Sequence, residues 1–251
     1  MGPCSHCQRK EPVYHGIKED FLQEYLNECC YISVDDIGLR FQKPERKGKH
    51  KKDRSFIENT VIHVQASEKQ YTLTAIGMDK AFKQLVALLL GNGLMENHRL
   101  IFFSEGATCI RDHIGKFFGF RQHTVILDWL HLKKKCNEFL SIAIKGSKDE
   151  KQQIKKELVS ILWTGRSESA IKYLEALKKS HIKNPIKIEG LKGYISRKSP
   201  NLTCYALRHE LGLRISSNHV EKANDLVVAN RQKHNGMSWS IKGSGSLAVI
   251  T

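Results

Sequence analysis

The sequence predicts an α/β protein in which a mixed β-sheet is flanked by helices. Three observations predict this fold class. Three strand patterns joined by short links come first, strand and helix patterns then alternate, and residues from about 131 to 211 show only helical periodicity before one closing helix. Short links followed by β–α alternation favour a mixed sheet covered by helices, here with an all-helical block before the last helix.

The spacing of apolar residues places each element along the chain. It predicts strands over 30–42, 60–65, 70–76, 100–107 and 123–129, and helices over 19–27, 79–91, 108–117 and about 218–232. In the helix over 79–91, Phe82, Leu85, Val86 and Leu89 form one apolar stripe, and Asp79 is expected to cap its first turn. Three further stripes mark the helical block: Leu132, Cys136, Phe139 and Leu140; Ile154, Leu158, Ile161 and Leu162; and Ile171, Leu174 and Leu177.

Composition indicates a globular, positively charged chain. Its 251 residues include 41 Lys and Arg against 26 Asp and Glu, a net charge of +15, and 40% are hydrophobic, which excludes a disordered or collagen-like chain. Such a surplus attracts polyanions such as nucleic acid, with an affinity that falls as salt rises. The longest apolar run, 85–90, is too short for a membrane helix, and no signal peptide is visible. We therefore expect a soluble, cytoplasmic protein without a membrane partner.

The seven cysteines are scattered and do not form a disulfide framework. Cys4 and Cys7 have the spacing of half a zinc site, and only the adjacent pair at 29 and 30 offers a second half. Zinc binding and a terminus with free thiols both remain open.

The first strand changes its apolar phase in mid-course. Apolar residues alternate on one face up to Val34 and on the other face from Ile37. A bulge, or burial on both sides, would account for this change. It falls on Asp35 and Asp36, and because ionised carboxylates resist burial unless they are paired, this pair predicts a nearby cation.

Two other acids have a similar setting. Glu105 closes a strand directly before Gly106, at the edge of a sheet, and Glu221 lies in the first turn of the closing helix. Carboxylates from distant parts of a basic chain suit Mg²⁺, and two such ions can stabilise the attacking and leaving oxygens of a phosphodiester. The alternative is that these are ordinary acids, with Glu221 part of an arrangement similar to a capping box.

A basic segment, 43–54 (KPERKGKHKKDR), contains no apolar residue and is expected to form an exposed loop. It is either a solvated surface loop or a loop that contacts phosphates. The candidate phosphate contacts are Lys47, Lys49, Lys51 and Lys52.

Four segments resemble the catalytic core of DDE transposases: 31–36 (YISVDD), 102–107 (FFSEGA), 126–135 (ILDWLHLKKK), and 218–225 (NHVEKAND) with 231–239 (RQKHNGMSW). The chain is most similar to the ISLre-type insertion-sequence transposases, a bacterial branch near the Mutator-like group. The resemblance implies an RNase H-like core over 29–245, with an all-helical insertion at about 133–212 before the last helix. Residues 1–28 would then be an N-terminal remnant or linker, and 246–251 a tail.

The resemblance also implies an activity: cleavage and transfer of DNA strands at transposon ends, dependent on Mg²⁺ or Mn²⁺. Asp35, Glu105 and Glu221 match the catalytic acids that hold the metal. The matched supporting residues are Asp36, Asp128, His131 and Asp225. The expected DNA-binding residues are Lys133, Lys134, Lys135, Arg231 and Lys233, and the expected partners are transposon ends, target DNA and further copies of the chain assembled on DNA in the bacterial cytoplasm, near the nucleoid.

Two departures from the family pattern bear on activity. Glu105 stands where the family has Asp, and the extra methylene moves the carboxylate by about an ångström, which matters because Mg²⁺ requires near-ideal geometry. The first catalytic strand also begins by residue 30, which predicts a truncated or decayed copy. A non-catalytic DNA-binding remnant and an RNase H-like nuclease therefore remain alternatives. Trp129 and Trp239 are expected either to stack on bases or to belong to the core.

Overall fold

The structure is a computed structural model that describes residues 24–25, 29–40, 56–217, 240 and 242–244. The chain divides into two compact units. One, the sheet unit, comprises Leu22–His131 and Ser216–Thr251, and the other, the helical unit, comprises Met1–Phe21 and Leu132–Ile215.

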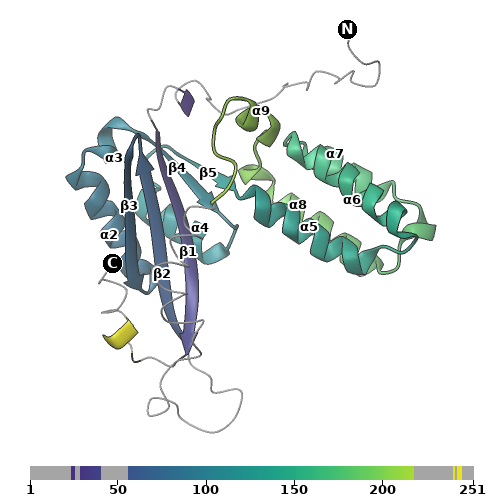
Figure 1. Ribbon diagram of the computed structural model, residues 1–251, viewed down its shortest axis with the longest axis horizontal. Helices are drawn as coiled ribbons and strands as arrows, with labels where there is room; N and C mark the ends of the chain where they lie inside the picture. The colour runs from purple at the N-terminus through teal and green to yellow at the C-terminus, as the bar shows by residue number, and fades with distance from the viewer. Residues whose placement is uncertain (1–23, 26–28, 41–55, 218–239, 241, 245–251) are drawn as a thin grey trace, which may run out of the picture. The chain divides into compact units, whose positions relative to one another are not determined.

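The sheet unit contains a five-stranded β-sheet with the strand order β3-β2-β1-β4-β5 (Figure 1). The strands are β1 (Cys29–Arg40), β2 (Phe56–Ala66), β3 (Lys69–Ile76), β4 (Arg99–Ser104) and β5 (His123–Leu127). Strands β1, β2 and β3 pair antiparallel, whereas β4 pairs parallel with both β1 and β5. This order and these directions are those of an RNase H-like sheet, so the predicted fold class is confirmed.

In the sheet unit, α2 (Met78–Gly91) and α3 (Leu94–Asn97) follow β3, and α4 (Thr108–Phe118) follows β4. Helices α2 and α4 cover one face of the sheet (Figure 1). On this face Leu85 of α2 and Ile114 of α4 join Ile32 of β1 and Phe102 of β4 in a buried cluster. Removal of these side chains from water is the main force that holds the helices on the sheet.

Asp79 does not cap α2 as predicted. The residue at the cap position is Gly77, and Asp79 lies inside the first turn, where its carboxylate accepts a hydrogen bond from Lys116 of α4 and lies 3.1 Å from Lys83 Nζ. The acid therefore still lies near the positive end of the helix dipole, and it also connects α2 to α4.

The change of apolar phase in β1 occurs without a bulge. Its pairing with β2 runs unbroken from Cys30 to Arg40. Ile32 and Val34 are buried on the face that α2 and α4 cover, while Ile37 and Leu39 are buried on the other face. The strand is thus buried on one face up to Val34 and on the other face at Ile37 and Leu39, while Asp36 and Gly38 are exposed.

The helical unit contains α5 (Trp129–Ala143) from Leu132 onward, α6 (Lys148–Trp163), α7 (Ser167–Glu175), α8 (Pro185–Lys198) and α9 (Tyr205–Glu210), with short 3₁₀ turns at Lys179–His181 and Ser199–Asn201. The predicted stripes supply its core, and Leu140, Leu158 and Leu174 are almost fully buried. A capping box formed by Ser147 and Glu150 begins α6. Among the described helices, none is long and apolar enough to cross a membrane.

Candidate functional site at the carboxyl edge of the sheet

Three acids lie just beyond the points where the parallel pairing of β1, β4 and β5 ends. The parallel pairing of β1 with β4 ends at Ser33 and Phe103, and Asp35 and Glu105 each follow two residues later. Asp35 is still within β1 and Glu105 is the first residue after β4, so both acids lie just beyond the last parallel pair of these strands. The third acid, Asp128, follows β5 directly, and its N–H extends the β4–β5 pairing with a 2.9 Å hydrogen bond to Ser104 O.

The chain turns away from the sheet immediately after Glu105. Gly106 has a φ of +87°, a conformation that glycine adopts without steric cost, and its N–H donates to Ser104 Oγ at 3.0 Å. The residues before this turn are buried, whereas Glu105 is exposed. The turn therefore leaves the Glu105 carboxylate in solvent at the edge of a buried strand.

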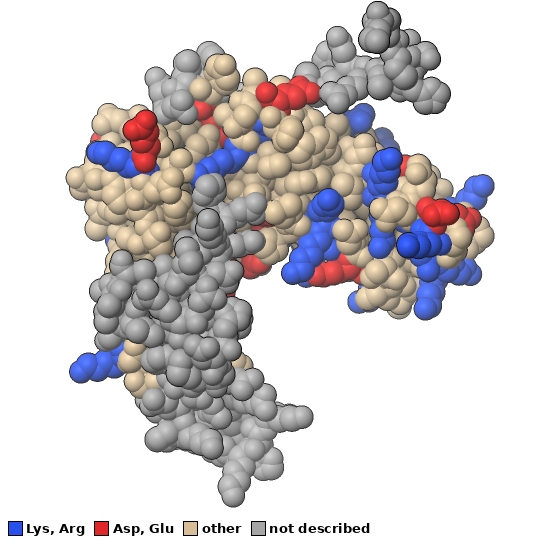
Figure 2. Space-filling model, viewed as in Figure 1, with Lys and Arg blue, Asp and Glu red and all other residues tan. Residues whose placement is uncertain are grey.

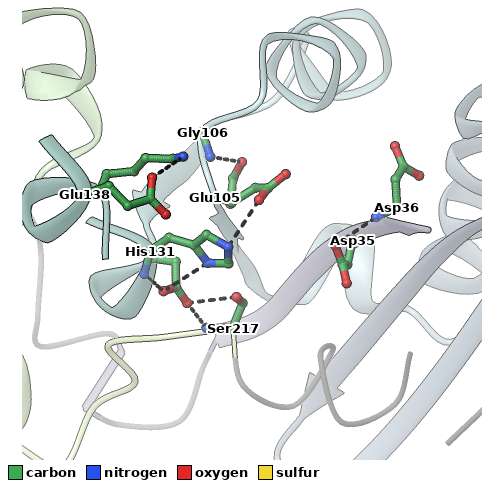
Figure 3. A network of polar contacts seen from close by, with 10 residues as sticks. Asp35, Asp36, Glu105, Gly106, His131, Glu138 and Ser217 are labelled. Carbon is green, nitrogen blue, oxygen red and sulfur yellow. Dashed lines mark hydrogen bonds and ion pairs between the residues drawn. The ribbon is translucent and has the colours of Figure 1, made fainter. Parts of the chain in front are cut away.

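His131 bridges two of these acids (Figure 3). Its Nε2 lies 3.2 Å from Glu105 Oε2, and its Nδ1 lies 3.5 Å from Asp128 Oδ1. The neighbouring carboxylates, Asp128 first and then Glu105, raise the pKa of His131 to about 10 against the opposing effect of burial. At neutral pH the ring is therefore an imidazolium held between two carboxylates.

Asp128 is fully buried and uses both of its oxygens. Oδ1 accepts the N–H of His131 at 2.7 Å in the first turn of α5, and Oδ2 accepts the N–H of Ser217 and its hydroxyl, the latter at 2.8 Å. Burial alone would raise the pKa of Asp128, but the hydrogen bonds from His131 and Ser217 outweigh burial and lower it. An ionised carboxylate thus joins the end of β5, the start of α5 and residue 217 within the sheet unit.

Asp35 and Asp36 point to opposite faces of β1 (Figure 3). The N–H of Asp36 donates to Asp35 Oδ1 at 2.9 Å, and Asp36 Oδ1 accepts a 2.5 Å hydrogen bond from Thr60 Oγ1 of β2. The pKa of Asp36 is raised by burial first and then by the charges of Asp35, Glu58 and Glu105, with the Thr60 bond acting in the opposite direction. The carboxylates at this edge therefore repel one another.

The donors at this edge fit a hard divalent cation in their chemistry, because Mg²⁺ and Mn²⁺ prefer carboxylate oxygens. A cation near Asp35 and Glu105 would also offset the repulsion between their charges and the carboxylate of Asp36. Within the part of the chain that the structure describes, no three Asp, Glu, His or Cys side chains come together as a metal site. Glu221 and Asp225 lie outside the described residues.

The structure brings together Glu105, Asp128 and His131, all of which the sequence singled out. It also adds Ser217 and Thr60, whose contacts with Asp128 and Asp36 no local pattern indicated. Trp129 is only 8% exposed and belongs to the core, which favours that alternative over base stacking.

The predicted DNA-binding residues divide into two groups. On α5, Lys133 and Lys134 are exposed, whereas Lys135 Nζ pairs with Glu138 at 2.8 Å. Outside the described residues lie Lys47, Lys49, Lys51, Lys52, Arg231 and Lys233, together with Trp239 and the candidate zinc ligands Cys4 and Cys7.

The fold and this edge define an RNase H-like α/β protein with acids and a protonated histidine at the carboxyl end of its sheet. No family model matches the chain, and no curated protein matches it in sequence. Among solved structures, the Drosophila P element transposase strand transfer complex is similar at 9% identity and a TM-score of 0.29, over 90% of this chain. This chain spans 64% of the length of that chain. So low a TM-score carries no argument, and the fold class rests on strand order and direction.

Proposed function

We propose that this chain is the core of a DDE transposase, of the ISLre type, that cleaves and transfers DNA strands with Mg²⁺ or Mn²⁺. The position of Asp35 and Glu105, each two residues beyond the last parallel pair of β1 and β4, carries this proposal. It puts two carboxylates where the parallel pairing of an RNase H-like sheet ends, and open sheets bind ligands beyond the carboxyl ends of their strands. The four segments that resemble DDE transposases support the same assignment.

The third proposed ligand, Glu221, follows Ser217 by four residues in the sequence. Ser217 is fixed by Asp128, and Asp128 lies 3.5 Å from the His131 ring that contacts Glu105. Four residues of chain span at most roughly 14 Å, which is the upper limit on the distance between Ser217 and Glu221. In this proposal Asp225, one helical turn beyond Glu221, supports it.

Each residue of the edge then has a separate task. Metal ions bound by Asp35, Glu105 and Glu221 would supply activation of water or a 3′-hydroxyl and stabilisation of the leaving oxygen. His131 orients the Glu105 carboxylate, since its Nε2 proton is held against Glu105 Oε2. Asp128 in turn fixes the His131 ring through the start of α5. Exposed lysines such as Lys133 and Lys134 contact phosphates, and further copies of the chain assemble on the DNA.

Substitution of the two described acids tests this function. Asp35→Asn keeps the side-chain shape but removes a charged oxygen donor, so we expect nicking of insertion-sequence end DNA in Mg²⁺ or Mn²⁺ to fall at least about 100-fold, because a metal ligand has been lost. Glu96→Gln, an exposed acid on α3, is the matched control and keeps wild-type activity. Equal nicking by Asp35→Asn and wild type would refute the proposal.

Glu105→Asp tests the departure from the family pattern. If the extra methylene weakens metal binding, this variant nicks end DNA faster than wild type, because it restores the carboxylate position that the family uses. Equal rates in the two forms show that Glu105 does not impair the site.

One observation favours a non-catalytic DNA-binding remnant as the second candidate. Glu105 Oε2 already contacts the His131 imidazolium, and a carboxylate in such a pair has less to offer a cation. Calorimetry with Mn²⁺ separates the candidates: the transposase binds Mn²⁺ through Asp35, whereas the remnant shows the same heats for wild type and Asp35→Asn. Cleavage of RNA–DNA hybrids without preference for end sequences would instead indicate an RNase H-like nuclease.

A further inference from the structure

Two turns of the helical unit are fixed side by side. An antiparallel bridge pairs Ile144, between α5 and α6, with Ile182, between α7 and α8. Backbone hydrogen bonds of 2.8 Å flank the bridge, from Lys145 N–H to His181 O and from Lys183 N–H to Ala143 O. The bridge therefore holds the two turns together as one backbone platform.

This platform is strongly basic, and we call it the lysine edge. Its two segments, 143–151 and 176–187, contain seven lysines against two acids, Asp149 and Glu150. The lysines are Lys145, Lys148, Lys151, Lys178, Lys179, Lys183 and Lys187. Glu150 is already engaged, because its carboxylate accepts the Ser147 N–H at 2.7 Å in the capping box. Figure 2 shows Lys and Arg side chains gathered over the helical unit.

Some lysines elsewhere in the helical unit have acidic partners, whereas others in its described part, such as Lys133 and Lys134, form no ion pair. Lys192 Nζ lies 2.9 Å from Glu175 and 3.1 Å from Glu189. On the lysine edge, five lysines are exposed and form no ion pair with any acid in the described part of the chain: Lys145, Lys148, Lys178, Lys179 and Lys183.

We propose that the lysine edge binds the phosphate backbone of duplex DNA. Like charges fixed on one platform repel one another, and a polyanion relieves that repulsion while it releases bound counterions. Ammonium groups act as point charges toward phosphate, so this contact positions DNA without reading its sequence. The site uses no residue of the carboxyl edge of the sheet, and it goes beyond the proposed catalytic function because it needs no metal.

The test compares two variants that lose the same charge. The first, Lys145→Gln/Lys179→Gln/Lys183→Gln, removes three cations of the lysine edge, and the control, Lys69→Gln/Lys80→Gln/Lys156→Gln, removes three exposed cations elsewhere. Binding of an arbitrary 30-bp duplex is measured by fluorescence anisotropy in EDTA, over about 50 to 200 mM KCl. Each lost phosphate contact lowers the slope of log K against log salt by about 0.9, so we expect a decrease of about 2.7 for the first variant and less than about 1 for the control.

Lysine acetylation supplies a second readout. The 30-bp duplex should protect Lys145, Lys179 and Lys183 of the wild type from acetylation, as measured by mass spectrometry, more than Lys69 and Lys80. Equal slopes for the two variants, or equal protection of the two groups of lysines, would overturn the proposal, because DNA would then respond only to net charge. Both readouts omit divalent metal, so failure of the nicking experiment leaves them interpretable.

Discussion

Asp128 and Ser217, 89 residues apart in the sequence, are joined through one oxygen atom: Asp128 Oδ2 accepts both the backbone N–H and the hydroxyl of Ser217. The acceptor is ionised and fully buried. Hydrogen bonds to a charged group in such a setting are roughly twice as strong as neutral ones. This contact therefore anchors residue 217, which directly precedes the segment that carries Glu221, to the end of β5.

Asp128→Asn should release this anchor. An amide of the same shape offers one acceptor oxygen instead of two, so either His131 N–H or the Ser217 donors lose their partner. We expect the free energy of unfolding to fall by about 2–4 kcal/mol, measured by urea denaturation, and the Ser217 amide to exchange hydrogen faster. Ser217→Ala loses only the hydroxyl bond and should cost about 1 kcal/mol. Wild-type exchange at Ser217 in Asp128→Asn would contradict the anchor.

Because His131 is an imidazolium in the folded protein, we expect the free energy of unfolding to decrease in alkaline solution. Its folded-state pKa of about 10 lies above the ordinary value of 6.5, so between these pH values the folded protein holds a proton that the unfolded chain has released. The stabilisation is therefore complete below pH 6.5 and is lost as pH rises through about 10, with a slope of up to about 1.4 kcal/mol per pH unit. His131→Gln removes this contribution. Urea denaturation across this range checks it, and parallel curves for the two proteins would show that His131 is not held as an imidazolium.

The pKa of Asp36 depends on two opposing effects, a hydrogen bond from Thr60 that lowers it and neighbouring negative charges that raise it. Thr60→Val removes a hydrogen bond that lowers the pKa of Asp36, so this pKa should rise further. Glu105→Gln removes a negative charge that raises it, so the pKa should fall. Carboxyl ¹³C NMR titration measures both variants. An unchanged or higher pKa of Asp36 in Glu105→Gln would mean that Glu105 and Asp36 do not interact across the sheet edge.

Most elements could be predicted from the sequence, because their burial is periodic. The pattern over 79–91 became α2 (Met78–Gly91), and that over 70–76 became β3 (Lys69–Ile76). Strand β2 begins four residues before its predicted start, at Phe56, since that extension is fixed by pairing with the distant end of β1, where Leu39 lies opposite Ile57. Pairing between strands is a tertiary contact that the spacing within one segment does not encode.

In the candidate site, too, local features could be predicted from the sequence and contacts between distant segments could not. Asp35 and Glu105 could be predicted because each acid ends or interrupts an apolar strand, which is a local signal. The bonds from Ser217 to Asp128 and from Thr60 to Asp36 could not, because each joins segments far apart in the chain and a buried serine or threonine has no distinctive spacing.

A pair of glycines tests the packing of the helical unit. Gly165 follows α6 with a φ of +77°, and a Cβ there would lie 2.7 Å from the backbone oxygen of Thr203, whereas Gly212 has a φ of +69° with nothing within 4 Å. Gly212→Ala carries only the strain of a left-handed alanine, about 1 kcal/mol. Gly165→Ala adds a clash with the backbone of Thr203, which must move. It should therefore lower the free energy of unfolding by about 1–3 kcal/mol more than Gly212→Ala does. Urea denaturation gives both values. Equal losses would mean that the end of α6 and the segment before α9 do not approach each other closely, and a larger loss at Gly165 identifies that approach as the reason for glycine at this position.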